Sequence, residues 1–168
     1  MSEISALLEA NRAFAATNDV GGRPMAPRRP LAILTCIDAR LHPEEFLGLQ
    51  IGDAHVLRNA GGRASDDALR SLIVSSWLLG TREFLVIHHT DCGMTVFTND
   101  ALVQIVKDGT GGDVSSIDFL TFSDLDEGVR EDVERVRALG DKLPDGVSVA
   151  GYVYDVETGG LREVSPVS

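Results

Sequence analysis

The sequence predicts an α/β fold with a mostly parallel central sheet flanked by helices. Short apolar runs typical of buried strands alternate along the chain with segments of helical periodicity, and this alternation indicates a parallel sheet. The last two apolar runs, 147–156 and 161–164, are separated only by Glu157-Thr-Gly-Gly160, which favours an antiparallel hairpin. At 168 residues the chain is long enough for a hydrophobic core, and we expect 1–168 to form a single domain.

The first 30 residues are expected to form an N-terminal helical arm and a linker. Apolar residues recur at helical spacing after Ser2, a possible cap; they are Ile4, Leu7, Leu8 and Phe14. Residues 18–30 contain Gly21-Gly22 and three prolines, which is typical of a connector. The helix is therefore free to pack on the body of the protein or on a partner subunit.

The next strands are predicted at 31–36, 54–58 and 83–88, with helices between them. Pro43, followed by two glutamates, marks the start of a short helix that ends near Gly48. This order of strand and helix places successive strands side by side in one sheet.

A longer helix is predicted between Ser65, its cap, and Gly80, its end. Apolar residues occupy nearly all of its sides; they are Leu69, Leu72, Ile73, Val74, Trp77, Leu78 and Leu79. A helix that is apolar all round requires burial all round, so we expect another subunit to cover one face. The sequence thus predicts a homodimer or a homotetramer.

Two further helices are predicted before the hairpin. One is capped by Thr98 or Asn99, runs through Val106 and is closed by Gly109, which begins a glycine-rich loop. The other opens at residues 123–124 and has one apolar face.

Composition restricts the partners and the compartment. The formal net charge of −11 argues against nucleic acid or an anionic membrane as a partner, because both require clustered Lys and Arg. No apolar run approaches the length of a membrane helix, and Met1-Ser-Glu-Ile lacks the features of a signal peptide, so we expect a cytoplasmic protein. With only two cysteines in a chain of this length, metal binding is a better interpretation than a disulfide framework.

Two of the predicted strands end in residues that bind metals. The first strand ends at Cys36 and is followed by Asp38 and Arg40, and the third is followed by His89 and Cys92. Parallel strands in one sheet present their carboxyl ends on the same side, so these residues are expected to meet. A set of two cysteines and one histidine suits Zn²⁺ and leaves a fourth position for water or for Asp38.

These residues resemble the paired Cys-x-Asp-x-Arg and His-x-x-Cys motifs of the β-class carbonic anhydrases. The matching segments are Cys36-Ile-Asp-Ala-Arg40, Arg58-Asn59-Ala60-Gly61-Gly62, the helix from Asp66, and His89-Thr-Asp-Cys92-Gly93. The resemblance implies four parallel strands with an antiparallel edge strand, a Zn²⁺ cofactor, and an N-terminal helix that embraces a second subunit.

The resemblance also implies an activity, the reversible hydration of CO2 to bicarbonate by zinc-bound hydroxide. Asp38 and Arg40 are then the expected catalytic residues: Asp38 held by Arg40 accepts a hydrogen bond from the zinc hydroxide, whereas Asp38 on the metal closes the site. Asn59, Gly61 and Gly93 are expected to contact the substrate.

Three alternatives stay open from sequence. The resemblance extends to hydrolases of carbonyl sulfide or carbon disulfide with the same motifs, and the sequence barely separates these substrates from CO2. A closed zinc site, with Asp38 as a permanent ligand, would make a non-catalytic module. Cys36 and Cys92 could also be inert buried thiols.

Overall fold

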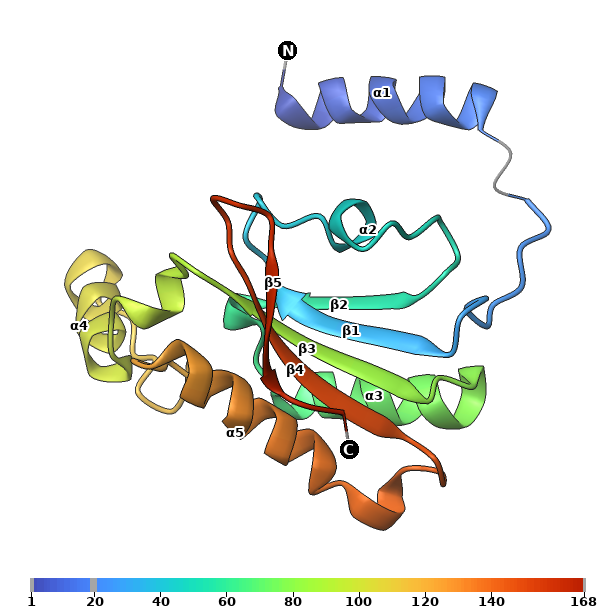
Figure 1. Cartoon of the computed structure of the whole chain (residues 1–168). Coiled ribbons are helices and arrows are strands. Elements are labelled where there is room, and N and C mark those ends of the chain that lie inside the picture. Colours follow the sequence, from blue (N-terminus) through green and yellow to red (C-terminus); the bar gives the residue numbers. More distant parts are fainter. Residues whose placement is uncertain (1, 19–20, 168) are drawn as a thin grey trace.

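The computed structural model describes residues 2–18 and 21–167, and these residues form a five-stranded sheet in the order β2-β1-β3-β4-β5 (Figure 1). The strands are β1 (Leu31–Cys36), β2 (His55–Asn59), β3 (Glu83–His89), β4 (Ser148–Tyr154) and β5 (Leu161–Ser165). The first four pair in parallel, and β5 is antiparallel to β4 at one edge. The predicted fold class, a mostly parallel sheet with an antiparallel edge strand, is therefore confirmed.

The helices follow the predicted order. They are α1 (Glu3–Thr17), α2 (Pro43–Phe46), α3 (Asp66–Leu79), α4 (Asn99–Thr110) and α5 (Leu125–Arg137), with single 3₁₀ turns at η1 (Ala60–Gly62), η2 (Gly93–Thr95) and η3 (Gly140–Lys142). Within the described ranges, no helix combines the length and the apolar character that a membrane crossing requires.

The predicted end of α4 is wrong. The helix continues through Gly109 and is capped by Gly111, which adopts a left-handed conformation with φ of 73°. A glycine inside a helix costs only about 1 kcal/mol, so Gly109 does not have to end the helix. The loop therefore begins two residues later than the sequence suggested.

One face of the sheet packs against α3 and α5. The fully buried residues of this layer include Ala32, Leu34, Leu72, Phe84, Val86, Val129 and Val133. Gly151 of β4 allows α5 to approach closely, because a Cβ atom there would lie 2.5 Å from Val129 Cγ1. Dense packing of this layer fixes the strands whose ends carry the site.

The opposite face has a thinner cover. Ile33 and Ile87 pack there against Leu49 and against partly buried residues of α2 and the chain that follows it. Figure 1 shows α2 on this side of the sheet, with α3 and α5 on the other. Helices thus flank both faces of the sheet, with α3 and α5 on one face and the shorter α2 on the other.

α1 and part of α3 present apolar side chains to solvent. None of the residues in α1 is buried, and the helix lies apart from the sheet (Figure 1). In α3 only one side is buried; Trp77 and Leu78 are 57% and 76% exposed. The linker is nevertheless tied to the body, since Arg28 forms an ion pair with the buried Asp53 at 2.7 Å.

Candidate metal centre

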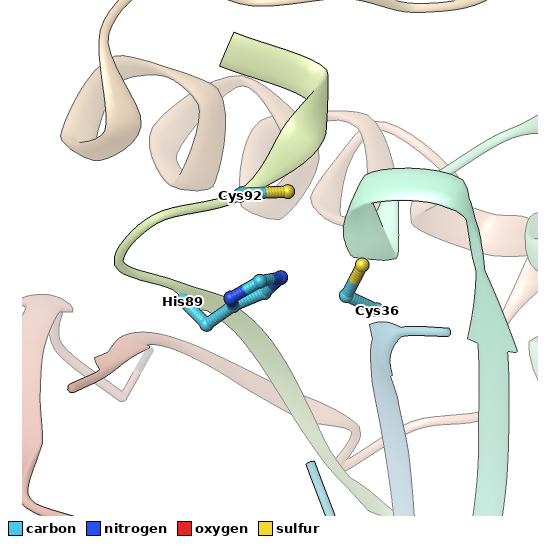
Figure 2. A group of neighbouring side chains, drawn as sticks. All are labelled: Cys36, His89 and Cys92. Atoms are coloured by element: carbon cyan, nitrogen blue, oxygen red, sulfur yellow. The ribbon is translucent and has the colours of Figure 1, made fainter. Parts of the chain in front are cut away.

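The three residues predicted as metal ligands meet at the carboxyl edge of the sheet. Cys36 is the last residue of β1 and His89 is the last residue of β3, and these two strands are parallel neighbours. Cys92 follows three residues later, after a turn. The two sulfur atoms and a ring nitrogen of His89 all lie within 4.8 Å of one another, and the three residues are buried (Figure 2).

The imidazole of His89 is oriented for metal binding. Its Nδ1 lies 2.9 Å from the carbonyl oxygen of Thr90, which can only accept, so Nδ1 carries the proton. Its Nε2 is buried and has no hydrogen-bond partner among the described residues. A buried nitrogen lone pair without a partner is costly, and a metal ion at this position would satisfy it.

The two thiols are coupled. The proximity of the Cys92 thiol lowers the pKa of Cys36 to about 4, although burial acts in the opposite direction. The same proximity, together with burial, raises the pKa of Cys92, so this thiol keeps its proton. Since metals bind thiolates, metal binding here would release that proton.

The surroundings of the cluster also suit Zn²⁺. Cys36 and Cys92 belong to an apolar cluster with Leu41, Met94 and Phe122. Thiolates and a neutral imidazole in such a setting are the preferred ligands of this ion, and three protein ligands leave a fourth position open. The residues present therefore fit a zinc site.

Asp38 lies beside the cluster and is held by Arg40. Arg40 Nε and Nη2 donate to the two carboxylate oxygens of Asp38 at 3.0 and 2.8 Å. This pairing holds the pKa of Asp38 well below its usual range, so the carboxylate stays ionised. Asp38 Oδ2 is 3.9 Å from His89 Nε2, which places it next to the position that the ligands face.

Two residues around the η1 turn hold the segment from Cys36 to Asp38 in place. The guanidinium of Arg58 donates to the carbonyl oxygens of Cys36 and Asp38 at 3.0 and 2.7 Å. Gly62 has φ of 69°, and a Cβ atom there would lie 2.9 Å from the carbonyl carbon of Thr35. The loop can approach the end of β1 this closely only with glycine at residue 62.

The three residues expected to contact a substrate have different surroundings. The side-chain amide of Asn59 spans its own loop, bonding to the backbone oxygen and nitrogen of Arg63 at 2.7 and 2.8 Å. Gly61 has φ of 79°, and a Cβ atom there would lie 3.0 Å from Met94 Cγ. Apart from the two neighbours of Gly93 in the chain, no described residue has a heavy atom within 4 Å of the position that a Cβ at Gly93 would take. Substrate contact by these residues stays a prediction.

A buried polar network behind the site was not predicted. Asp132 of α5 is fully buried and accepts from His88 Nε2 at 2.9 Å, from the Ala64 N–H at 2.9 Å and from Arg63 at 3.1 Å. These contacts join α5, β3 and the loop that carries Gly61 and Gly62. The available signal was an acid on the apolar stripe of an amphipathic helix, because Asp132 lies between Val129 and Val133 on that face.

Comparisons with known proteins agree with this geometry. A carbonic anhydrase family model matches residues 31–113. The β-carbonic anhydrase 1 of Mycobacterium tuberculosis is 41% identical over 157 residues, which cover 94% of this chain and 95% of that protein. The chain belongs to the β-carbonic anhydrase family.

Other relatives extend the comparison. The crystal structure of a carbonic anhydrase from Streptococcus mutans superposes on this family member with a TM-score of 0.92 and 43% identity, covering 98% of this chain and 99% of that one. A carbon disulfide hydrolase of Saccharolobus solfataricus is 39% identical over 157 residues, which cover 80% of this chain and 77% of that protein. The family relationship thus includes proteins named for two different substrates.

Replacing Asp132 should destabilise this fold severely. Asp132→Ala leaves His88 Nε2 without its acceptor and removes the buried carboxylate that pairs with the Arg63 guanidinium, and loss of one partner of such a buried pair costs about 3–5 kcal/mol. The measurement is the free energy of unfolding from urea denaturation. The control is Glu131→Ala, which removes a 52% exposed partner of the same arginine and should cost less than about 1 kcal/mol. Equal losses for the two variants would contradict the assigned network.

Proposed function

We propose that this protein catalyses the reversible hydration of CO2 to bicarbonate, with Zn²⁺ bound by Cys36, His89 and Cys92. The observation that carries the proposal is the ionised carboxylate of Asp38, held by Arg40 at 3.9 Å from the free nitrogen of His89. Membership of the β-carbonic anhydrase family supports it, as does the 41% identity to a protein of that name.

The bound ion would supply one part of the chemistry, the activation of a water molecule as a nucleophile near neutral pH. Residues of the protein chain would orient this water molecule. Because Arg40 keeps Asp38 ionised, the Asp38 carboxylate only accepts hydrogen bonds and has no proton to give. Its Oδ2 can therefore hold the proton of the attacking water and direct a lone pair toward the carbon of CO2.

The apolar side chains near the cluster favour a small apolar substrate. Leu41, Met94 and Phe122 pack with the two cysteines, so one side of the site is apolar. Bicarbonate, by contrast, is charged, and its departure from such surroundings is favourable.

The second candidate is hydrolysis of carbon disulfide or carbonyl sulfide at the same site. It is supported by the 39% identity to the carbon disulfide hydrolase of Saccharolobus solfataricus. These molecules are linear analogues of CO2, so the same nucleophile and the same orienting carboxylate would attack their central carbon. Hydrolysis would release sulfide, which makes the two activities easy to separate.

A paired assay on zinc-verified protein separates the two candidates. We expect rapid CO2 hydration in stopped flow and little sulfide release from carbonyl sulfide or carbon disulfide. Asp38→Asn should lower kcat about 100-fold at unchanged zinc content, because a neutral amide orients the water poorly and leaves Arg40 without its partner. Asp126→Asn, which removes an Arg162 ion pair away from the site, should leave kcat unchanged.

The contradicting outcomes are distinct. Sulfide release with feeble hydration would reject carbonic anhydrase activity in favour of the hydrolase. Zinc-loaded protein that shows neither activity above the level of Asp38→Asn would reject both candidates and indicate a non-catalytic zinc module.

We also infer that the protein is a homodimer in which α1 packs on a second copy of the chain. An isolated helix of 15 residues is marginal in water, and none of the residues in α1 is buried by its own chain. Its apolar stripe, formed by Ile4, Leu7, Leu8 and Phe14, is 45–69% exposed. The exposed part of α3 around Trp77 and Leu78 offers further apolar surface for the contact.

Charges on the stripe should disrupt this dimer. Leu7→Glu combined with Leu8→Glu is expected to shift the mass in sedimentation velocity from twice the chain mass of 18.0 kDa to the single chain mass. Ala6→Glu combined with Ala13→Glu adds the same charges on another side of the helix and should leave the mass unchanged. A wild-type protein that sediments as a monomer, or two variants that behave alike, would contradict the inferred contact.

A further inference from the structure

The turn that carries the ligands also touches the catalytic arginine. Asp91 lies between His89 and Cys92, and its carboxylate accepts from Arg40 Nη1 at 2.7 Å. Its backbone oxygen accepts from Arg40 Nη2 at 3.1 Å. The contact of Asp91 with Arg40 was not predicted from the sequence.

We propose that Asp91 is a positioning residue that holds the guanidinium of Arg40 in place independently of Asp38. The proposal rests on the proposed function, in which Arg40 in turn holds the orienting carboxylate. Asp91 does not face the reacting atoms, and its effect on the reaction is transmitted through Arg40.

The two edges of the guanidinium are bound separately. Nε and Nη2 face Asp38, whereas Nη1 and Nη2 face Asp91. A guanidinium is planar and its donors have a fixed geometry, so contacts along two edges define both its position and its orientation. If Asp38 turns away from Arg40, the contacts with Asp91 are still in place, and Asp38 has a fixed partner to which it can return.

The backbone of Asp91 favours this arrangement. Its φ is 56°, a left-handed conformation that aspartate tolerates better than most residues. In this conformation both the side chain and the carbonyl oxygen of Asp91 bond to the same guanidinium. Arg40 thereby links the segment that follows β1 to the ligand turn that follows β3.

Because the Asp91–Arg40 ion pair is exposed, a positioning role of Asp91 can be distinguished from a role in folding stability. The side chains of Asp91 and Arg40 are 77% and 47% exposed, and ion pairs this accessible to water contribute little to folding. Losing the Asp91 carboxylate should therefore leave the fold and the metal ligands intact. The effect should appear in the placement of Arg40 and in the turnover that depends on it.

The kinetic test compares two substitutions that both tolerate a left-handed backbone. Asp91→Gly keeps the turn and the carbonyl but removes the carboxylate, and Asp91→Asn keeps a neutral acceptor. For CO2 hydration we expect Asp91→Gly to lower kcat about 10-fold, with KM, zinc content and Tm unchanged, and Asp91→Asn to retain an intermediate kcat. Asp126→Asn is again the control variant, because it too removes the carboxylate of an aspartate–arginine ion pair but lies away from the site.

A second readout needs neither substrate nor metal. The Nη protons of Arg40, identified by their absence in Arg40→Lys, give separate NMR signals while rotation of the guanidinium is restricted. In Asp38→Ala only Asp91 holds Arg40, and we expect the separate signals to persist. In the double variant Asp38→Ala/Asp91→Gly they should be lost.

Each result decides the proposal. Wild-type kcat in Asp91→Gly, or loss of the separate Arg40 signals in Asp38→Ala alone, would overturn it. If the wild-type protein hydrates no CO2, the proposed function fails, and the NMR comparison still decides whether Asp91 holds Arg40 without Asp38.

Discussion

The parallel pairing of β1 with β3 is the constraint on which the rest of the site depends. Adjacent parallel strands end at the same edge, so Cys36 and His89 meet although they are far apart in the sequence. Cys92 then needs only the turn at Asp91 to complete the set. On the other side of β1, Asn59 at the end of β2 lies opposite Cys36 and begins the loop that surrounds it.

The two consecutive histidines of β3 show how the sheet separates structure from chemistry. Successive side chains in a strand point to opposite faces, so His89 faces the cysteines while His88 faces Asp132 in the layer under α5. The buried network around Asp132 holds together α5, β3 and the loop that carries Gly61 and Gly62. Asp38, Arg40 and Asp91, by contrast, are partly or largely accessible to solvent, where a carboxylate can change partners without disturbing the core.

Sequence reasoning succeeded where the pattern is local. The apolar runs that end at Cys36 and His89 indicated both the strands and the ligand set, because hydrophobic periodicity and ligand spacing are properties of short segments. The contacts of Asp132 could not be predicted in this way, since they join residues of α5, β3 and a distant loop. The end of α4 was misplaced because the sequence does not show which of the glycines at residues 109 and 111 adopts the left-handed conformation that ends the helix, and in the structure it is Gly111.

The residues that contact the substrate could not be predicted from short segments either. Asn59 and Gly61 were selected from a motif, and in the structure the side chain of Asn59 bonds to the backbone of Arg63, while Gly61 lies close to Met94. Which side chains touch the substrate depends on the loops and on any surface that a second subunit adds, and neither follows from a single segment. The three candidate metal ligands, by contrast, lie at the ends of two adjacent strands and in the short turn that follows one of them.

The most direct test of this account is X-ray absorption at the zinc K-edge of the metal-loaded protein. Coordination by Cys36, His89 and Cys92 predicts two sulfur ligands at about 2.3 Å and a nitrogen ligand at about 2.0–2.1 Å. Cys36→Ser should lose one of the sulfur ligands. Zinc bound through oxygen and nitrogen alone, or a spectrum that Cys36→Ser leaves unchanged, would contradict the account.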